Sequence, residues 1–501
     1  MKKIFALLLI LTMCIAVFVG CAAAPIGGDM YYYPPQSGMF DLDENYQFDE
    51  IKEKDFVSAS ETADSYFSLD RHTSGYSLMR RQIVEKGKLN ASSVRIEDYI
   101  NYFNYNYARP TGDDSLALGG SLFDCPWNAQ HKLLRIGVAA EELTLDDGIS
   151  NNIVFLLDTS GSMYGEDRLP LVQQAFTMLL PLLGANDTVS VVTYASGTKV
   201  LCEGLAATES NKTRIANIIS DIVAGGSTNG EGGINLAYKC AEKYKTATSN
   251  NRVILATDGD FNVGASSKSA LEKLISDKAK KGVDLTILGV GMGNTRDDFM
   301  ETLAKNGNGT AAYIDTITEA RKVLVEDFGG TMRTVAYDAK AKVVFNADVV
   351  DSYRIIGYEN SILTSDEYED SKTQAGEIGS GHTVTAVYEV VLKDGATDGS
   401  TAANIEVKYK KKPLTDTEED NPEFAVNCEI KLDKAYVPTD DDKFVACVVE
   451  YGLLLRDSKY KSDATFAAVI ARLNELGDYV SADGFKAEFL QIVKSAMDLY
   501  Q

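Results

Sequence analysis

The stretch Phe155-Leu156-Leu157-Asp158-Thr159-Ser160-Gly161-Ser162-Met163 passes from an apolar run into a short polar turn. The apolar run begins at Ile153 and has the composition of a buried strand. Asp158, Ser160 and Ser162 then alternate with Thr159 and Gly161, so a turning backbone could direct three oxygen groups at one point. The stretch therefore predicts a strand that ends at a site built from oxygen-bearing side chains.

The middle third of the chain repeats a strand-then-helix pattern. Short runs rich in Val and Ile predict strands at residues 152–157, 188–194, 252–257, 284–290 and 311–314. Amphipathic stretches between them predict helices at residues 169–183, 213–223, 230–245 and 267–281. Such alternation gives βαβ units, whose right-handed crossovers produce a parallel sheet covered on both faces. We therefore expect an α/β fold with a doubly wound, mostly parallel sheet, and an antiparallel edge at residues 199–202.

Strand-like segments flank this α/β region on both sides. They cover residues 116–122 and 132–139 before it, and residues 339–345, 383–392 and 405–409 after it. We predict that the α/β domain is inserted into a β-rich domain built from residues 115–140 and 335–410. Helices are expected at residues 74–86, 92–102, 443–455, 464–476 and 485–499. The predicted divisions are a signal peptide at 1–20, a tether at 21–47, a helical segment at 48–110, strands at 111–145, the α/β domain at 150–330, and a C-terminal domain at 331–501 with strands to 412 and then helices.

The N-terminus predicts export. A basic start, Met1-Lys2-Lys3, precedes an apolar run from Ile4 to Val19, and small residues surround Cys21. This resembles a bacterial lipoprotein signal, in which cleavage before Cys21 frees that residue for lipid attachment. A plain signal peptide and an uncleaved anchor are the alternatives. We expect the remaining chain to be extracytoplasmic and lipid-anchored to a bacterial membrane.

The net charge limits the classes of partner that the chain is expected to bind, and the cysteines indicate whether disulfide bonds are expected. The 501-residue chain has a net charge of −24, which argues against nucleic acid or an anionic membrane surface as the partner. The same charge could equally serve solubility. Beyond the signal and Cys21, five cysteines remain, and their odd number and wide spacing do not form a disulfide framework. We expect buried free thiols, with one disulfide bridge as the alternative.

Two further segments converge with the first polar turn. Asp258 follows the apolar run Ile254-Leu255-Ala256-Thr257, and Gly225-Gly226-Ser227-Thr228 precedes a predicted helix. Doubly wound sheets bind ligands at the carboxyl ends of their strands, where the strand order reverses. With the order 3-2-1-4-5-6, the strands that end in Asp158 and Asp258 are neighbours at that reversal, and all three loops meet there.

The residue types in these loops suit a hard cation. Two carboxylates held close together repel each other unless a cation neutralises them. Hydroxyl oxygens are hard, neutral donors suited to Mg²⁺, Ca²⁺ or Mn²⁺ and unsuited to zinc. The predicted hydroxyl ligands are Ser160, Ser162 and Thr228, and Asp158 and Asp258 would bind the cation, with Mg²⁺ preferred, directly or through water. One coordination position would stay open for an acidic side chain of a partner; a metal-free loop with N-capping Asp and Ser is the alternative.

The sequence here resembles a known family. Asp158-Thr159-Ser160-Gly161-Ser162, the later Thr228 and Asp258-Gly259 are similar to the metal-ion-dependent adhesion site of von Willebrand factor type A domains. Flanking stretches resemble a bacterial family of lipoproteins that contain this domain: residues 68–107, 251–263, 291–294, 379–385 and the C-terminal region. Ser68 to Thr73 departs from the Asp-Val-Asp-Thr usual in that family. The resemblance implies binding of a protein ligand through a divalent cation, without catalysis.

Other polar residues are expected to have ordinary roles. We expect Asp260, Asn262 and Glu231 to be supporting or surface groups, and Asp167 and Asp187 to be solvated loop acids. The three histidines are too scattered for a zinc site or a catalytic triad. No catalytic residue is therefore predicted. The rival functions are a magnesium-dependent hydrolase and a structural envelope protein with a vestigial metal site.

Overall fold

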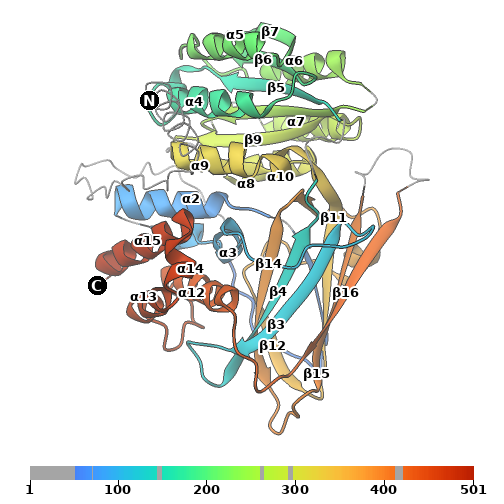
Figure 1. The fold of residues 1–501 in the computed structure, drawn as a ribbon, viewed down its shortest axis with the longest axis vertical. Helices are drawn as coiled ribbons and strands as arrows, with labels where there is room; N and C mark the ends of the chain where they lie inside the picture. Colours follow the sequence, from blue (N-terminus) through green and yellow to red (C-terminus); the bar gives the residue numbers. More distant parts are fainter. Residues whose placement is uncertain are drawn as a thin grey trace, which may run out of the picture. The chain divides into compact units, whose positions relative to one another are not determined.

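The central α/β domain contains one six-stranded sheet with the order β10-β9-β8-β5-β6-β7 (Figure 1). A computed structural model describes residues 51–69, 71–87, 89–143, 149–246, 248–259, 265–291, 297–411 and 421–500. The strands are β5 (Asn151–Asp158), β6 (Thr188–Tyr194), β7 (Thr198–Ala206), β8 (Asn250–Thr257), β9 (Asp284–Val290) and β10 (Ala311–Ile314). All neighbours pair in parallel except β6 and β7, which are antiparallel. The predicted fold class and the antiparallel edge are confirmed.

Helices cover both faces of this sheet because its strands are apolar on both sides. Ile153, Phe155 and Leu157 of β5 share a core with one set of helices, whereas Val154 and Leu156 share a second core with the other set. The first set comprises α4 (Leu169–Leu179), α5 (Glu209–Ser220), α9 (Ile317–Arg321) and α10 (Phe328–Met332). The second comprises α6 (Gly230–Tyr244), α7 (Ala265–Ala279) and α8 (Asp297–Asn306).

The β-rich region consists of two sheets that share a single core. One has the order β1-β12-β14-β4-β3, and the other β13-β11-β15-β16, with β2 paired to β11. The strands of the first are β1 (Val57–Ser58), β12 (Val350–Ile356), β14 (Thr383–Leu392), β4 (His131–Ala140) and β3 (Leu116–Asp124). Those of the second are β13 (Gly376–Gly379), β11 (Thr334–Phe345), β15 (Thr401–Lys410), β16 (Glu423–Lys431) and β2 (Asp64–Ser68). Buried side chains such as Ile136, Tyr388, Val343 and Ile405 fill the space between them.

The strands on either side of the α/β domain pair with each other. β4, which precedes the domain, is antiparallel to β14, which follows it, from His131↔Val391 to Ala139↔Thr383. β11 begins at Thr334 and is separated from α10 by Arg333 alone. The α/β domain therefore occupies an insertion between two segments of the same β-rich region.

A third group of elements is helical. α2 (Ser74–Arg81) continues as a π-helical turn, Gln82–Lys86, and shares a core with α3 (Ile96–Tyr102) and the C-terminal helices. The C-terminal helices are α12 (Asp440–Leu455), α13 (Phe466–Glu475), α14 (Asp478–Ser481) and α15 (Gly484–Tyr500). Figure 1 shows α2 and α3, drawn in blue, beside the C-terminal helices, drawn in red.

Two of the predicted assignments of secondary structure to segments were wrong. The segment at 48–110, expected to be helical, also contributes β1 and β2 to the sheets. The strands of the C-terminal domain do not end at 412, because β16 pairs along β15. β1 has only two residues, too few for a detectable pattern. β16 does alternate apolar and polar residues, with Phe424, Val426, Cys428 and Ile430 on its more buried face, and our prediction overlooked that signal.

Within the described residues, no helix is both long enough and apolar enough to cross a membrane. The predicted signal at 1–20, Cys21 and most of the tether lie outside the described residues. The five cysteines that are described, Cys125, Cys202, Cys240, Cys428 and Cys447, are all free.

Candidate metal centre

The candidate site lies where the strand order of the α/β sheet reverses. Numbered along the domain, the six strands have the order 3-2-1-4-5-6, so β5 and β8 are adjacent. Leu157 of β5 pairs with Ala256 of β8, which brings the ends of the two strands to the same edge. Asp158 is the last residue of β5, and Asp258 directly follows β8. Both predicted carboxylates therefore occupy the edge at which doubly wound sheets bind ligands.

The first loop gathers three of the predicted ligands. The backbone N–H of Ser160 donates to Asp158 Oδ1 at 2.9 Å, and the hydroxyl oxygens of Ser160 and Ser162 are 2.9 Å apart. A 3₁₀ turn over Gly161–Met163 brings Ser162 back toward Ser160. Asp158 and Ser160 are buried, at 0% and 1% exposure, and Ser162 is partly exposed. The alternation of residues in this stretch does direct its oxygen atoms into one small region.

The glycine-rich second loop lies directly against the first. Gly161 N–H donates to the carbonyl oxygen of Gly226 at 2.9 Å, and Gly225 N–H donates to that of Thr159 at 2.8 Å. Gly226 has a φ of +92°, and a Cβ atom there would lie 2.6 Å from Ser196 Oγ. Glycine is therefore required for this approach. Thr228 is partly buried two residues beyond the junction, just before α6.

The residues at the end of β8 support Asp158 from the other side. Thr257 Oγ1 donates to Asp158 Oδ2 at 3.2 Å and accepts from Gly259 N–H at 3.1 Å. Asp258 is only 4% exposed. Burial raises the pKa of Asp158, hydrogen bonding from Ser160 opposes that rise, and the charge of Asp258 adds to it. The two carboxylates therefore influence each other at short range.

Sequence reasoning missed Arg168, the residue that precedes α4. Its Nη1 donates to the carbonyl oxygen of Ser162 and lies 3.7 Å from Asp258 Oδ2. The side chain also packs on Gly291, where a Cβ atom would lie 2.6 Å from Arg168 Nε. No sequence signal distinguishes this arginine from other loop arginines, since its role depends on the fold of the loop. It supplies a positive charge at the side of the site.

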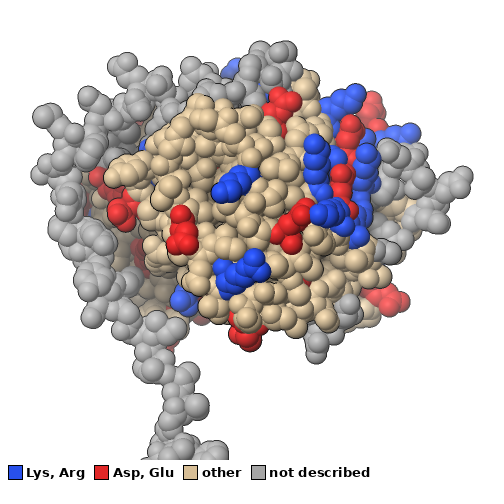
Figure 2. Space-filling view, turned by 90° about the horizontal axis from the view of Figure 1, so that it is seen from above, with Lys and Arg blue, Asp and Glu red and all other residues tan. Residues whose placement is uncertain are grey.

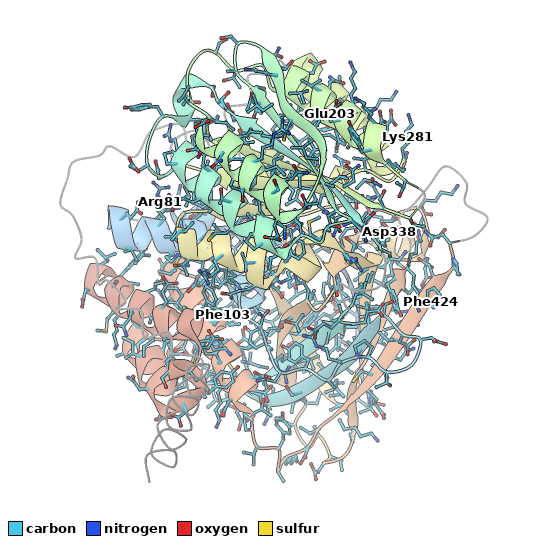
Figure 3. The ribbon with its side chains drawn as sticks, turned by 45° about the horizontal axis from the view of Figure 1, so that its top comes forward. Arg81, Phe103, Glu203, Lys281, Asp338 and Phe424 are labelled. Atoms are coloured by element: carbon cyan, nitrogen blue, oxygen red, sulfur yellow. The ribbon has the colours of Figure 1, made fainter. Side chains whose placement is uncertain are left out.

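Of the two acids that we expected to be solvated, Asp187 is buried, whereas Asp167 is partly exposed and ion-paired. Asp167 Oδ2 accepts from Arg81 Nη2 of α2 at 2.6 Å, and Arg81 helps to lower the pKa of this carboxyl. Figure 3 shows Arg81 where α2 lies beside the α/β domain. Asp187 is 6% exposed and accepts from the backbone N–H groups of Asn151, at 2.6 Å, and Gly184, at 2.8 Å. Glu231 is exposed as expected, and Asp260 and Asn262 lie outside the described residues.

The donor set fits a hard divalent cation. Asp158 and Asp258 would supply two negative charges, and Ser160, Ser162 and Thr228 would supply neutral hydroxyl oxygens. In the described part of the chain, no group of three or more His, Cys, Asp or Glu residues could hold a metal ion, so sites built from those ligands alone are not an alternative there. The hydroxyl oxygens are thus essential to the candidate site.

Three families match this chain. The family described as "von Willebrand factor type A domain" matches residues 152–326, and one described as "von Willebrand factor" matches residues 42–135. "Uncharacterized protein YfbK, C-terminal" matches residues 330–499. The chain is 32% identical over 455 residues to a protein of Escherichia coli described as "Uncharacterized protein YfbK", covering 86% of this chain and 77% of that one. The chain belongs to the YfbK family.

This YfbK-family chain thus contains a von Willebrand factor type A domain followed by the family's C-terminal domain. Inter-alpha-trypsin inhibitor heavy chain H4 of Sus scrofa is 26% identical over 231 residues, and the match spans only 25% of that protein and 44% of this chain. Among solved structures, a von Willebrand factor type A protein from Catenulispora acidiphila aligns with a TM-score of 0.42 at 15% identity. That alignment covers 76% of this chain and 89% of the other.

Despite the negative net charge of the chain, one face of the molecule carries few acidic side chains over much of its area. Figure 2 views the molecule from the side at which α5, α6 and β7 lie in Figure 1, and charged side chains are sparse over much of that face. Where they gather, basic and acidic side chains stand side by side. Ion pairs of this kind join Lys243 to Glu203 at 2.7 Å and Lys278 to Glu242 at 2.7 Å. This face therefore presents mixed charge to solvent.

Proposed function

We propose that this protein binds a protein partner through a divalent cation held by Asp158, Ser160, Ser162, Thr228 and Asp258. The observation that carries the proposal is the junction of the three loops. Two nearly buried carboxylates end adjacent strands, and backbone hydrogen bonds clamp the serine loop to the loop that leads to Thr228. A carboxylate of the partner would complete the coordination of the cation.

The surrounding residues would hold these ligands in place. Ser160 N–H and Thr257 Oγ1 each bond one oxygen of Asp158, which fixes its carboxylate plane before a cation arrives. Arg168 fixes the carbonyl of Ser162 and partly offsets the charge of Asp258. When bound, the cation would supply a local positive charge that attracts an acidic group despite the net charge of −24.

We propose binding without catalysis. The basic side chain that contacts the serine loop, Arg168, carries a guanidinium that does not release its proton and so cannot serve as a general base. The ligands are arranged to hold a cation, and a vacant coordination position is sufficient for a binding role. Mg²⁺ is the proposed cation, since hydroxyl and carboxylate oxygens are its preferred ligands, and Ca²⁺ and Mn²⁺ share that preference.

We also propose that the chain is an extracytoplasmic lipoprotein, attached to a bacterial membrane through lipid on Cys21. The basic start, the apolar run from Ile4 to Val19 and the small residues around Cys21 support this proposal. Metabolic labelling with a radioactive fatty acid tests it. The wild-type chain should take up label, and a Cys21→Ser chain should take up none.

The metal site is tested by isothermal titration calorimetry with Mg²⁺. Asp158→Ala and Thr228→Ala should each weaken Mg²⁺ binding by about 100-fold or more, because each removes a side chain proposed to hold the cation. Glu231→Gln, an exposed change three residues beyond Thr228, is the matched control and should bind Mg²⁺ as the wild type does. Circular dichroism should report an unchanged fold in all three variants. Unaltered Mg²⁺ affinity in Asp158→Ala would refute the proposed site.

A further inference from the structure

The loops of the candidate metal centre carry two unusually exposed apolar side chains. Tyr164 is 84% exposed and Val223 is 81% exposed. Among the large hydrophobic side chains that the structure describes, only Val437, at 77%, is comparably exposed. Two of these three residues therefore belong to loops that lead into or out of the proposed ligands.

Both residues are close to the junction of the two loops. Tyr164 follows the 3₁₀ turn and its N–H donates to the carbonyl oxygen of Gly161 at 3.3 Å. Gly161 in turn bonds Gly226, which lies three residues after Val223. Gly225, two residues after Val223, bonds Thr159. Tyr164 and Val223 thus lie within three residues of the backbone hydrogen bonds that join the two loops.

The packing of the fold does not account for their exposure. Met163, directly before Tyr164, is completely buried in the core of the α/β domain. Ile222 and Ala224, on either side of Val223, also pack against that core, whereas Val223 points away from it. A single exposed apolar side chain is ordinary, but two of them on loops that are hydrogen-bonded to each other beside the proposed ligands indicate an interaction surface.

The charges nearby determine the chemistry of a suitable partner. Glu166 lies two residues beyond Tyr164, Asp221 lies two residues before Val223, and both are exposed. A partner segment with several acids would be repelled by these carboxylates. A segment with one carboxylate between apolar residues would place its charge on the cation and its apolar groups against Tyr164 and Val223.

We propose that Tyr164 and Val223 form an apolar rim around the metal centre, and that the rim selects a protein segment in which a single Asp or Glu is flanked by aromatic or aliphatic residues. This inference rests on the proposed function and specifies the partner of the same site. The cation would bind the carboxylate of the partner segment. Tyr164 and Val223 would contact the apolar residues that flank that carboxylate. Each rim side chain should contribute about tenfold to affinity, as for a well-buried contact residue.

The test uses the mature full-length chain and immobilised nonapeptides with one central Asp. The Asp is flanked by Leu and Phe, by Ser, or by Glu, and binding is measured with Mg²⁺ and with a chelator. The wild type should bind the Leu and Phe peptides at least tenfold more tightly than the Ser and Glu peptides, and only with Mg²⁺. Tyr164→Ser and Val223→Ser should each reduce that preference about tenfold. Val437→Ser is the matched control for loss of an exposed apolar group and should leave it intact.

Calorimetric titration with Mg²⁺, run on the same samples, separates the two proposals. The rim variants should bind Mg²⁺ normally, because neither residue is a proposed ligand. If the wild type binds Mg²⁺ normally but binds all Asp peptides with equal affinity, or binds none of them, the proposed role of the rim is wrong and the metal centre is not contradicted. Preference for the Leu and Phe peptides that persists in the Tyr164→Ser, Val223→Ser double variant would also overturn it. If the wild type does not bind Mg²⁺ at all, the proposed metal centre itself is wrong.

Discussion

Glu97, in the first turn of α3, illustrates how one buried carboxyl can make stability depend on pH. Its Oε2 is buried and has no hydrogen-bond partner among the described residues. Burial raises the pKa of Glu97 to about 8, and the charges of Glu359 and Asp98 add to the rise while Arg456 opposes it. Glu97 is therefore protonated in the folded protein at neutral pH, whereas in the unfolded chain it ionises near pH 4.5.

Glu97→Gln should make stability less sensitive to pH. Between about pH 4.5 and pH 8 the folded state holds a proton that the unfolded state releases, so the free energy of unfolding of the wild type falls as pH rises. One proton changes that free energy by at most about 1.4 kcal/mol per pH unit. Urea denaturation from pH 5 to pH 8 should give a shallower decline for Glu97→Gln.

The exposed Glu61→Gln is the matched control and should follow the wild type across this pH range. Equal slopes for Glu97→Gln and the wild type would contradict the protonated state of Glu97.

At the residue scale, the sequence predicts those site residues that lie close together along the chain in a regular spacing, because local backbone geometry then brings their side chains together. The alternation around Asp158 and the glycines before Thr228 are of this kind, and the loops they predict are adjacent in the structure. Arg168 and the partner of Asp167 could not be predicted. Arg81 lies 86 positions before Asp167 along the chain, and no local pattern links residues that far apart.

At the scale of elements, the start of α12 joins the helical group to the β-rich region. Thr439 and Asp442 form a reciprocal capping box there. Asp442 Oδ1 also accepts from Arg135 Nε of β4 at 2.6 Å and from Ser121 Oγ of β3 at 2.5 Å, and its Oδ2 accepts from Tyr436 at 2.7 Å. One carboxylate thus fixes the helix start and two strands.

Asp442→Ala should lower the free energy of unfolding by about 3 kcal/mol or more, because it leaves the nearly buried Arg135 guanidinium without its charge partner. Asp440→Ala is the matched control in the same helical turn. Asp440 is exposed and its ion pair with Lys443 is 3.6 Å long, so this change should cost less than about 1 kcal/mol. Urea denaturation followed by circular dichroism measures both. Equal costs would show that the network around Asp442 is not what stabilises this junction.

The sequence predicted long elements with a strong period better than short or polar ones. The bounds of β14 were predicted as observed, since its residues form one long run rich in Val that no turn-forming residue interrupts. β2 and β12 were missed because their sequences, DSYFS and VDSYRII, mix polar residues into short runs. Their pairing with β11 and β14 is set by tertiary contacts rather than by local pattern.

At the scale of the whole molecule, Arg80 of α2 connects three regions of the chain. It forms two hydrogen bonds to Asp315, at 2.9 and 2.5 Å, and one to Glu319, at 2.8 Å, both in the α/β domain. It also bonds Glu488 of α15 at 2.9 Å and the hydroxyl of Tyr102 in α3 at 3.1 Å. The side chains of Arg80, Asp315 and Glu319 are each no more than 5% exposed.

Arg80→Ala should destabilise the protein by about 3–5 kcal/mol, since it leaves two buried carboxylates without their counterion. It should also uncouple the α/β domain from the helical group, so that differential scanning calorimetry resolves two transitions in place of a shared one. Lys243→Ala, which breaks an exposed ion pair with Glu203, is the control and should cost less than about 1 kcal/mol. A single transition with an unchanged midpoint in Arg80→Ala would contradict the proposed coupling.

The insertion of the α/β domain also has a mechanical consequence. The domain is attached to the β-rich sheets by two covalent routes, one through β4 and one through β11. Each of these strands lies in the interior of its sheet, β4 between β3 and β14, and β11 between β13 and β15. Tension applied to the inserted domain would load these ladders in shear, so that many hydrogen bonds must rupture together rather than one by one. Such an attachment resists traction far better than a single terminal linker joined to an edge strand.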